Sequence, residues 1–529
     1  MPPAGAKGFG GNTMECSGEG ISRRDFLRGL AGTGAGLLLG GCRPTPRFSS
    51  RIAGPSGAQR AVDAAQRFRG MSLNVASESG PQANGLIVRD APLWEKLTGI
   101  HINVVEIGSD LSRFRWLIQE HREGAGTLDC ASVSIPSGPD LVDAGVLEPL
   151  DDYIAYYMPP GDRGDVLPLF GDLGDLNGHH YGLVDDGDSL LLYFRSDIFG
   201  DREVQEKFAA RYGHPLRDPR SFRWSDFVEA LEFFHGNLAP GVHPLAPLSL
   251  ELCWSLFQYR LRLEGGEFFS QSTMKPGVAS PAGARALSQV QQMLAMSVSG
   301  NTIIPQIETA IVSFMSGKSA MAIFWPPLAR WCANLSPTNE VFRSAPASQV
   351  AGRTCYSLLP DGYTEFSVGF MLSVMARSRR KEAAYLFCQW LNSPEMSLPR
   401  VMASDSLRDP FRLSHLHAPE YRKLWPGVEV YLDTLERAGT SMALLDLMML
   451  GANDYEAAFF KALTDLRLGS DVKTVLDEMA KVWENVTTRL GRPRQRRSYL
   501  QFLGRPGAIV PPRSSNVLPS PSPFSKYSE

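Results

Sequence analysis

Strand-like and helix-like segments alternate near the start of the chain, and this alternation limits the possible folds more than any other feature. Apolar runs predict short strands, whereas apolar residues spaced by three and four predict helices that end at residues such as Gly99. The expected strands are 73–76, 102–107 and 128–133, and the expected helices are 86–98 and 110–122. Alternation of this length predicts an α/β fold in which helices cover both faces of a parallel sheet.

The later part of the chain is more helical, with apolar spacing of three and four in several stretches. The clearest is 471–490, which Ser470 or Asp471 can cap. The other expected helices are 227–234, 251–263, 282–296 and 378–391. A chain of 529 residues exceeds the roughly 250–300 residues at which single cores stop growing, so we expect two lobes.

The charge is unevenly distributed although the formal net charge is only -3. Basic residues are concentrated in 43–70 and 491–529, whereas the body between them is acidic. An acidic body argues against nucleic acid as a partner, because nucleic-acid binding needs clustered Lys and Arg. We interpret 43–70 as a flexible tether and 491–529 as a disordered tail rich in Arg, Pro and Ser. Weak attraction of these ends to anionic lipids is the alternative.

An export signal is the sharpest pattern in the sequence. Arg23 and Arg24, followed by Phe26 and Leu27, resemble a twin-arginine export motif. The apolar stretch 29–41 is shorter than the roughly 20 residues that cross a bilayer as a helix. It ends at Cys42, and the small residues before this cysteine resemble a lipobox.

We therefore expect 1–42 to be a twin-arginine signal peptide with a lipobox, and Cys42 to carry the lipid. Several acyl chains would hold the protein stably at the membrane, on the extracytoplasmic side. A chance cysteine after an ordinary signal peptide is the alternative interpretation.

The five cysteines of the body cannot all pair with one another. The twin-arginine resemblance implies folding before export, in a reducing cytosol, which favours buried free thiols. A Cys332–Cys355 disulfide remains possible. No pair of cysteines has the spacing of a zinc site, and we expect neither a metal nor a cofactor. These cysteines are Cys130, Cys253, Cys332, Cys355 and Cys388.

Short segments in a consistent order resemble the family 1 extracellular solute-binding proteins, the maltose- and sugar-binding components of ABC importers. The chain departs from the family at Val184, where a proline is usual, and in its long basic tail. The segments that carry the resemblance are 94–105, 140–151, 178–183, 192–199, 224–227, 314–323 and 381–395.

The resemblance implies a periplasmic-binding-protein-like fold, with two α/β lobes joined by three hinge crossovers and a ligand cleft between them. We expect the crossovers near 178–186, 323–330 and 366–374. Lobe 1 is then 71–180 with 326–368, and lobe 2 is 181–325 with 369–490.

The function that the resemblance implies is capture of a small polar ligand, such as a sugar or oligosaccharide, and its delivery to ABC permease subunits by a monomeric binding protein. Polar side chains would bind the hydroxyls, and aromatic rings would stack on the sugar. Trp254 can instead belong to the core, and 185–188 can be a solvated turn. The candidate ligand-binding residues are Glu78, Ser79, Asp186, Asp188, Trp254, Trp325, Tyr363, Phe366 and Arg408.

Two other functions stay open at this stage. The first is an exported enzyme similar to a glycoside hydrolase, although the chain lacks G-x-S-x-G, H-E-x-x-H and G-x-x-x-x-G-K. The second is a lipoprotein that senses or scaffolds without transport. The sequence favours a binding protein over an enzyme.

Overall fold

A computed structural model describes five stretches of the chain. The predicted signal peptide, the first part of the tether (43–55) and the end of the tail lie outside them. The described stretches are 56–108, 110–297, 306–334, 347–404 and 406–511.

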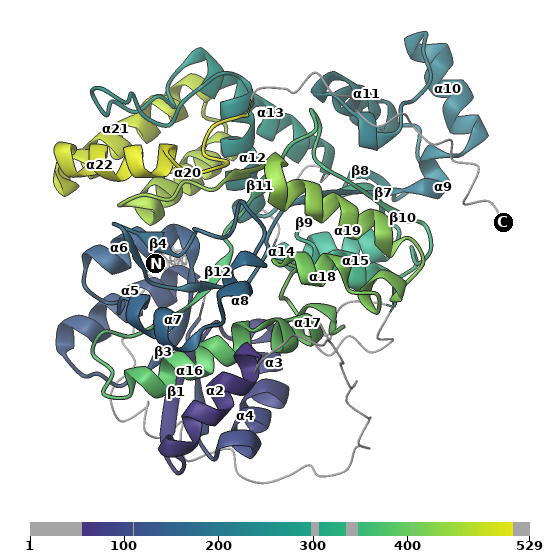
Figure 1. The fold of residues 1–529 in the computed structure, drawn as a ribbon. Helices are drawn as coiled ribbons and strands as arrows, with labels where there is room; N and C mark the ends of the chain where they lie inside the picture. Colours follow the sequence, from purple (N-terminus) through teal and green to yellow (C-terminus); the bar gives the residue numbers. More distant parts are fainter. Residues whose placement is uncertain (1–55, 109, 298–305, 335–346, 405, 512–529) are drawn as a thin grey trace, which may run out of the picture. The chain divides into compact units, whose positions relative to one another are not determined.

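Two mixed sheets organise the structure (Figure 1). Sheet 1 has the order β2 (His101–Glu106), β1 (Ser72–Ser77), β3 (Cys130–Ser134), β12 (Phe370–Val374) and β6 (Leu183–Val184). Sheet 2 has the order β10 (Thr354–Ser357), β7 (Leu191–Arg195), β9 (Ser319–Phe324) and β8 (His243–Leu245). Two small sheets pair β11 (Thr364–Phe366) with β13 (Ala443–Leu445) and β4 (Asp175–Leu176) with β5 (His179–His180).

Only part of each main sheet is parallel, so the expectation of a parallel sheet is wrong in detail. β1 runs parallel to β2 and β3, as the βαβ pattern predicts. β12 is antiparallel to both of its neighbours, β3 and β6. In sheet 2, β7 is antiparallel to β9 and β10. In sheet 1 the antiparallel strand β12 comes from a part of the chain far from its neighbours β3 and β6.

Helices of the first part of the chain surround sheet 1. Gly99 ends α4 in the left-handed conformation, with φ of 74°, which glycine adopts without strain. These helices are α2 (Gly57–Ala65), α3 (Pro81–Gly85), η2 (Leu86–Asp90), α4 (Ala91–Thr98), α5 (Asp110–Glu123), α6 (Gly138–Asp143), α7 (Asp151–Tyr157) and α8 (Pro160–Gly164). Short 3-10 turns lie at η1 (Gln66–Phe68) and η3 (Ile135–Ser137).

The middle of the chain supplies most helices around sheet 2. The later part of the chain supplies further helices, of which α16 packs on sheet 1 and α19 packs on sheet 2. Asp471 caps α21, since its carboxylate accepts from the Thr474 amide at 3.0 Å. The first group is α9 (Ser196–Phe199), α10 (Arg202–Tyr212), η4 (Pro219–Ser221), α11 (Trp224–Phe234), α12 (Leu250–Leu263), α13 (Pro281–Ser297), α14 (Ile307–Met315) and α15 (Pro327–Cys332). The second is α16 (Lys381–Asn392), α17 (Pro394–Met402), α18 (Leu413–His417), η5 (Tyr421–Lys423), α19 (Val428–Arg437), η6 (Ala438–Met442), α20 (Ala452–Arg467), α21 (Val472–Leu490) and α22 (Arg492–Leu503).

The predicted tether and tail both contain helices that belong to the folded body. α2 begins after Ser56, which accepts from the Gln59 amide at 3.2 Å, and it packs against α16, far away in the sequence (Figure 1). α22 buries Tyr499 and Phe502. The predictions of a tether up to residue 70 and of a disordered tail from residue 491 are therefore wrong for these helices. The apolar residues of α2 are small, and those of α22 are few among many charged residues, so both segments give only a weak sequence signal for a packed helix.

The apolar core runs without interruption between the two sheets. One cluster includes Val133 from sheet 1 and Ile323 from sheet 2, and a second joins sheet 1 to α2 and α16. The described residues group as a single unit by their contacts. The two sheets are therefore closely packed in this conformation. None of the described helices combines the length and the hydropathy that crossing a bilayer requires.

Candidate functional site

Three segments of the chain cross between the structural layers, and they meet one another. We name them by their residues: the first crossover (185–190) joins β6 of sheet 1 to β7 of sheet 2, the second (367–369) joins β11 of the small β11–β13 sheet to β12 of sheet 1, and the third (406–412) lies between α17 and α18. The crossover expected near 323–330 is wrong, because β9 before it and β10 after it both pair with β7 of sheet 2.

The same pairings reverse two lobe assignments. β10 lies within the segment 326–368 that was expected in lobe 1, yet it pairs with β7 of sheet 2. β12 lies within the segment expected in lobe 2, yet it pairs with β3 of sheet 1. The physical reason is that strand pairing over long separations leaves no local pattern in the sequence.

The first crossover is buried, so its acidic run is not a solvated turn. Asp185 and Asp186 have no exposed surface, and Asp188 is 6 % exposed. Asp188 accepts from the Gly369 amide of the second crossover at 3.0 Å. A side-chain carbon at Gly187 would lie 2.0 Å from the Pro410 carbonyl oxygen, so this close approach of two crossovers requires glycine.

Arg408 of the third crossover pairs with the first. Its Nη1 lies 2.8 Å from Asp186 Oδ2, and its Nε lies 3.3 Å from Asp185 Oδ2. The Asp409 amide also donates to Asp186, at 2.8 Å. Arg408 Nη2 donates to the Ser132 hydroxyl in the middle of β3, at 3.3 Å. The third crossover therefore reaches across the first to sheet 1.

Arg400 of α17 holds a second buried pair. It donates to both carboxylate oxygens of Asp185, at 2.7 and 2.9 Å, and its Nε lies 3.3 Å from Asp90. A two-point contact between a guanidinium and a carboxylate is the strongest ordinary ion-pair geometry. Arg89 Nε also donates to Asp90, at 3.0 Å.

These pairs surround a cavity at the carboxyl ends of β1 and β3, where open α/β sheets usually bind ligands. We call it the crossover cavity. Its volume is about 30 Å³, which is room for roughly one water. The lining residues are Val75, Ala76, Ser77, Gly85, Leu86, Arg89, Asp90, Ser132, Asp185, Leu372, Leu391, Arg400, Ser406, Leu407 and Arg408.

The polar candidates from the sequence have different positions. Asp186 and Arg408 are brought together, and Arg408 alone among the nine candidates lines the crossover cavity. Glu78 is half-buried and lies 3.6 Å from Arg113 Nη1. Ser79 is exposed.

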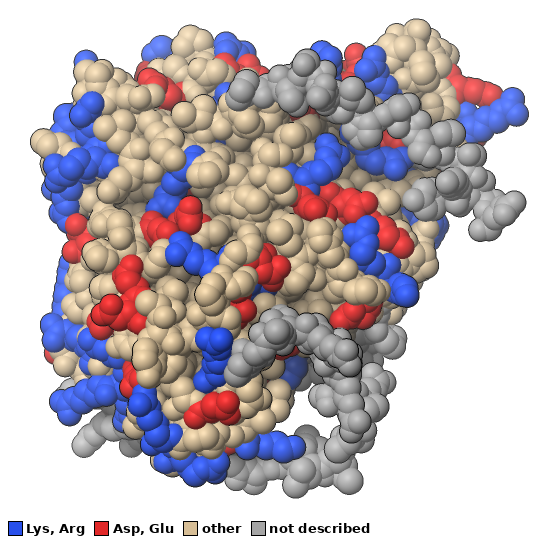
Figure 2. Space-filling view, viewed as in Figure 1, with Lys and Arg blue, Asp and Glu red and all other residues tan. Residues whose placement is uncertain are grey.

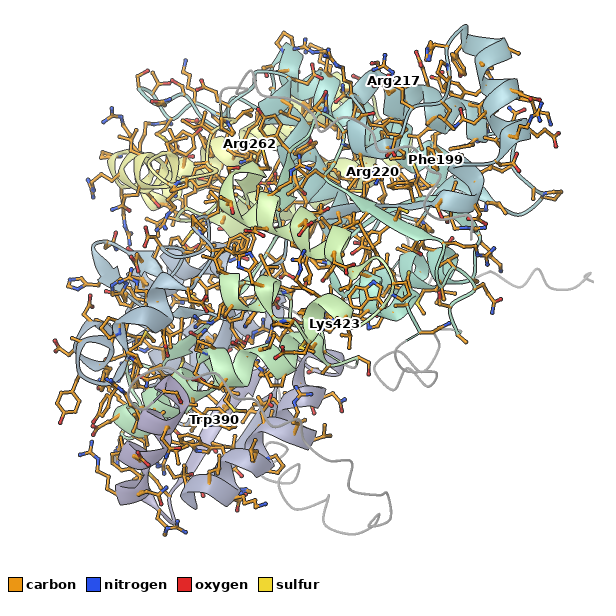
Figure 3. The ribbon with its side chains drawn as sticks, turned by 45° about the vertical axis from the view of Figure 1, so that its right-hand side comes forward. Phe199, Arg217, Arg220, Arg262, Trp390 and Lys423 are labelled. Atoms are coloured by element: carbon orange, nitrogen blue, oxygen red, sulfur yellow. The ribbon has the colours of Figure 1, made fainter. Side chains whose placement is uncertain are left out.

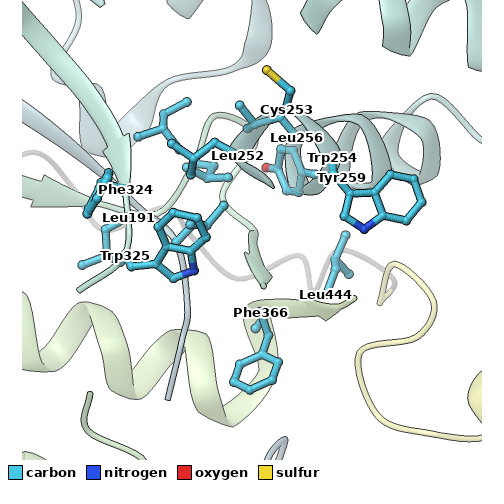
Figure 4. Packing of buried hydrophobic residues seen from close by; sticks show 14 of the residues in the cluster. Leu191, Leu252, Cys253, Trp254, Leu256, Tyr259, Phe324, Trp325, Phe366 and Leu444 are labelled. Carbon is cyan, nitrogen blue, oxygen red and sulfur yellow. The ribbon is translucent and has the colours of Figure 1, made fainter. Parts of the chain in front are cut away.

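The four aromatic candidates are buried in the core and do not line the cavity. Figure 4 labels three of them, Trp254, Trp325 and Phe366, among the buried hydrophobic residues. Trp325 Nε1 donates to the Ser367 carbonyl at 3.2 Å, and the Tyr363 hydroxyl donates to the Pro511 carbonyl at 2.9 Å. Phe366 packs on a phenylalanine ring, and Trp254 packs against other aromatic rings. These four rings fill the core rather than the cavity.

Arg408 is the one candidate among the lining residues, so the sequence did not identify others such as Arg89, Asp90, Ser132 and Arg400. Arg400 and Asp185 are separated by 215 positions. An arginine inside a helix gives no local sign of a buried partner so far away.

Three carboxylates at the meeting of the crossovers could hold a cation by geometry. Oxygens of Asp186, Asp188 and Asp409 all lie within 4.8 Å of one another. Burial raises the pKa of Asp188 well above its usual value, and the two neighbouring carboxylates raise it further. Arg408 already pairs with Asp186, and Arg330 lies 3.5 Å from Asp409. Two of the three carboxylates therefore already have a positively charged partner.

Two α/β layers linked by chain crossovers that meet at the carboxyl ends of sheet strands are typical of the periplasmic-binding-protein-like class of α/β proteins. Residues 94–425 match the model of the bacterial extracellular solute-binding proteins, and residues 20–40 match that of twin-arginine signal sequences. The chain belongs to the bacterial extracellular solute-binding protein family. The signal sequence and the family together indicate export from the cytoplasm.

Solved structures and a curated relative agree with this family. Maltose-bound MalE3 of T. maritima is 17% identical, with a TM-score of 0.62, and the match covers 79% of this chain and 100% of that one. A mannitol-bound ABC transporter solute-binding protein of Agrobacterium vitis is 18% identical, with a TM-score of 0.63, over 80% and 99%. A probable amino-acid ABC transporter periplasmic-binding protein of Sinorhizobium fredii is 23% identical, over 79% and 87%.

Proposed function

We propose that the protein binds a small hydroxyl-rich solute, a polyol or small sugar, at the crossover cavity and delivers it to an ABC permease as a non-enzymatic carrier. The observation that carries the proposal is the meeting of three crossovers at the carboxyl ends of β1 and β3. The ligands named for structures of the same fold, maltose and mannitol, support the ligand class.

The sheets must separate for a ligand to enter, because the crossover cavity holds roughly one water in this conformation. Separation breaks the contacts of Arg408 with Asp186 and Ser132. Ligand hydroxyls would replace these contacts, and hydrogen bonds to charged groups contribute about 1.5–3 kcal/mol each. A ligand favours the closed form only through such differential contacts.

The lining favours recognition by hydrogen bonds over stacking. Among the described residues, no aromatic side chain lines the crossover cavity. Arginines, aspartates and serines line it together with alanine, valine and leucine side chains, which suits flexible polyols as well as sugar rings. This is a change from the sequence expectation, in which tryptophan rings bind the sugar.

An amino acid is the second candidate ligand. The relative from Sinorhizobium fredii is named for amino-acid transport. The crossover cavity also contains both Arg400 and Asp90, which could bind an α-carboxylate and an α-ammonium group.

The test is a thermal-shift screen of the mature protein with mannitol, ribitol, maltose and the common amino acids, followed by calorimetry. A ligand at 100 times its Kd adds about 2.7 kcal/mol of stability. We expect Ser132→Ala to weaken binding and Ser79→Ala, an exposed control, to leave it unchanged. Absence of any shift across the panel, or equal effects of both variants, would contradict the proposal.

The lipid anchor and the delivery of ligand to a permease are separate parts of the proposal, and each needs its own experiment. We propose that Cys42 carries the lipid, as the small residues before it favour. Delivery predicts that the liganded protein stimulates the ATPase of its permease in proteoliposomes. Turnover of a glycoside would instead favour the enzyme, and binding only to another protein would favour a scaffold.

A further inference from the structure

A second cavity, which we call the β10 cavity, lies beside sheet 2 and shares no lining residue with the crossover cavity. Its volume is about 280 Å³. It is bordered by the starts of α9 and α19, by η4, by the end of α15 and by β10. The lining residues are Ser196, Arg220, Cys332, Ala333, Ala351, Gly352, Thr354, Cys355, Tyr356, Trp425, Pro426, Gly427 and Val430.

Buried side chains form the floor of the β10 cavity, and more exposed ones form its rim. Cys332, Tyr356 and Trp425 are each less than a tenth exposed. Ala351 and Pro426 are exposed. The cavity is therefore open to solvent at one side and lined by rings and small apolar groups at the other.

The polar groups around the cavity are largely occupied by partners within the protein. The Ser196 hydroxyl donates to the Arg353 carbonyl, and the Thr354 hydroxyl donates to the Val350 carbonyl, both at 3.1 Å. Arg220, labelled in Figure 3, donates through its Nε to the Asp218 carboxylate at 2.9 Å. Because these side chains already bond within the protein, they offer a ligand contact surface rather than free hydrogen-bonding groups.

Tyr356 is the exception, because it has one donor left. Its oxygen accepts a hydrogen bond from Trp425 Nε1 at 3.2 Å. A phenol can accept and donate at the same time. Among the described residues, no group accepts the proton of the Tyr356 hydroxyl, so Tyr356 can donate it to a molecule in the cavity.

We propose that the β10 cavity binds a small, mostly apolar ring compound that carries one hydrogen-bond acceptor. Its volume exceeds the roughly 150 Å³ of an apolar cavity that holds benzene. It approaches the roughly 300 Å³ at which ligand pockets begin. The ring lies against Trp425 and Tyr356, and the acceptor takes the Tyr356 proton. This site is separate from solute capture at the crossover cavity.

The test uses acetophenone, which has one carbonyl acceptor, and ethylbenzene, which has none. We expect calorimetry to show binding of acetophenone, with ethylbenzene about two- to tenfold weaker, the range of one hydrogen bond. Tyr356→Phe should remove this difference between the two compounds. Val430→Trp and Ala333→Leu, which fill the cavity, should abolish binding of both, whereas Ala210→Leu on the exposed face of α10 should not.

Alkylation locates the compound independently. Cys355 is half-buried, and the other four cysteines of the described residues are buried. We expect acetophenone to slow iodoacetamide labelling of the Cys355 peptide several-fold, measured by mass spectrometry, and mannitol to leave it unchanged. The proposal is overturned by absence of acetophenone binding to the unchanged protein, by undiminished binding of acetophenone to the two cavity-filling variants, or by binding without protection of Cys355.

Discussion

Arg400→Met is the most informative substitution, because Arg400 is held by several buried groups at once. It pairs with both oxygens of Asp185, lies 3.3 Å from Asp90 and donates to the Leu391 carbonyl at 3.2 Å. Methionine keeps much of the side-chain volume but removes the charge. The substitution leaves Asp185 with Arg408 as its remaining ion-pair partner, at 3.3 Å.

Breaking a buried pair by removing one partner costs about 3–5 kcal/mol, because the remaining charge stays buried. For a folding unit of 150–250 residues, each kcal/mol lowers Tm by about 2–4 °C. The melting temperature of Arg400→Met should therefore fall by roughly 6–20 °C. The double variant Arg400→Met with Asp185→Asn should recover much of this loss, because it removes the buried carboxylate that has lost its two-point partner.

Differential scanning calorimetry of the purified protein measures the effect, and the two-sheet body need not melt in one step. Arg202→Met is the matched control, since Arg202 and Glu206 form an exposed pair at 2.7 Å. Such surface pairs contribute about 0–1 kcal/mol. If Arg400→Met melts no lower than Arg202→Met, or if the double variant recovers nothing, the buried-pair reasoning is refuted.

Three further predictions concern pH, the crossovers and the anchor. Burial raises the pKa of Asp140 to about 7, above the unfolded value of about 3.9. The contribution of Asp140 to stability should therefore fall as pH rises from about 4 to 7. Asp140→Asn should flatten the slope of Tm against pH over this range, and parallel curves for the variant and the unchanged protein would contradict the prediction. Gly187→Ala should lower Tm and ligand affinity, because its new carbon would lie 2.0 Å from the Pro410 oxygen. Gly161→Ala, which has open space around it, should change neither quantity. Equal effects of the two substitutions would contradict the close approach of the first and third crossovers. Cys42→Ser should move the protein from the membrane fraction to the soluble fraction, and unchanged sedimentation would refute the lipobox.

Local patterns in the sequence predict the elements well, because a helix or strand depends on neighbouring residues. The expected helix 471–490 corresponds to α21, and the expected strand 102–107 corresponds to β2, shifted by one residue. The resemblance to solute-binding proteins adds the fold, which the family model and the solved structures confirm.

The site is harder to predict, because its contacts join distant segments. Asp186 and Arg408 were both chosen as ligand-binding residues, yet they bind each other across 222 positions. Trp325 follows β9 as expected, but it lies within the apolar core. Charged side chains of both signs are interspersed on the face shown in Figure 2, so surface charge does not mark the site there.

The position of β12 in sheet 1 has a consequence for biosynthesis. This strand lies between β3 and β6, but the ribosome releases it long after both of them. Until Phe370–Val374 emerges, β3 has an unpaired edge that invites aggregation. Because the twin-arginine resemblance implies folding before export, we expect sheet 1 to be completed after this strand emerges and before the chain leaves the cytoplasm. The late strand thus delays completion of sheet 1 until residue 374 has been synthesised.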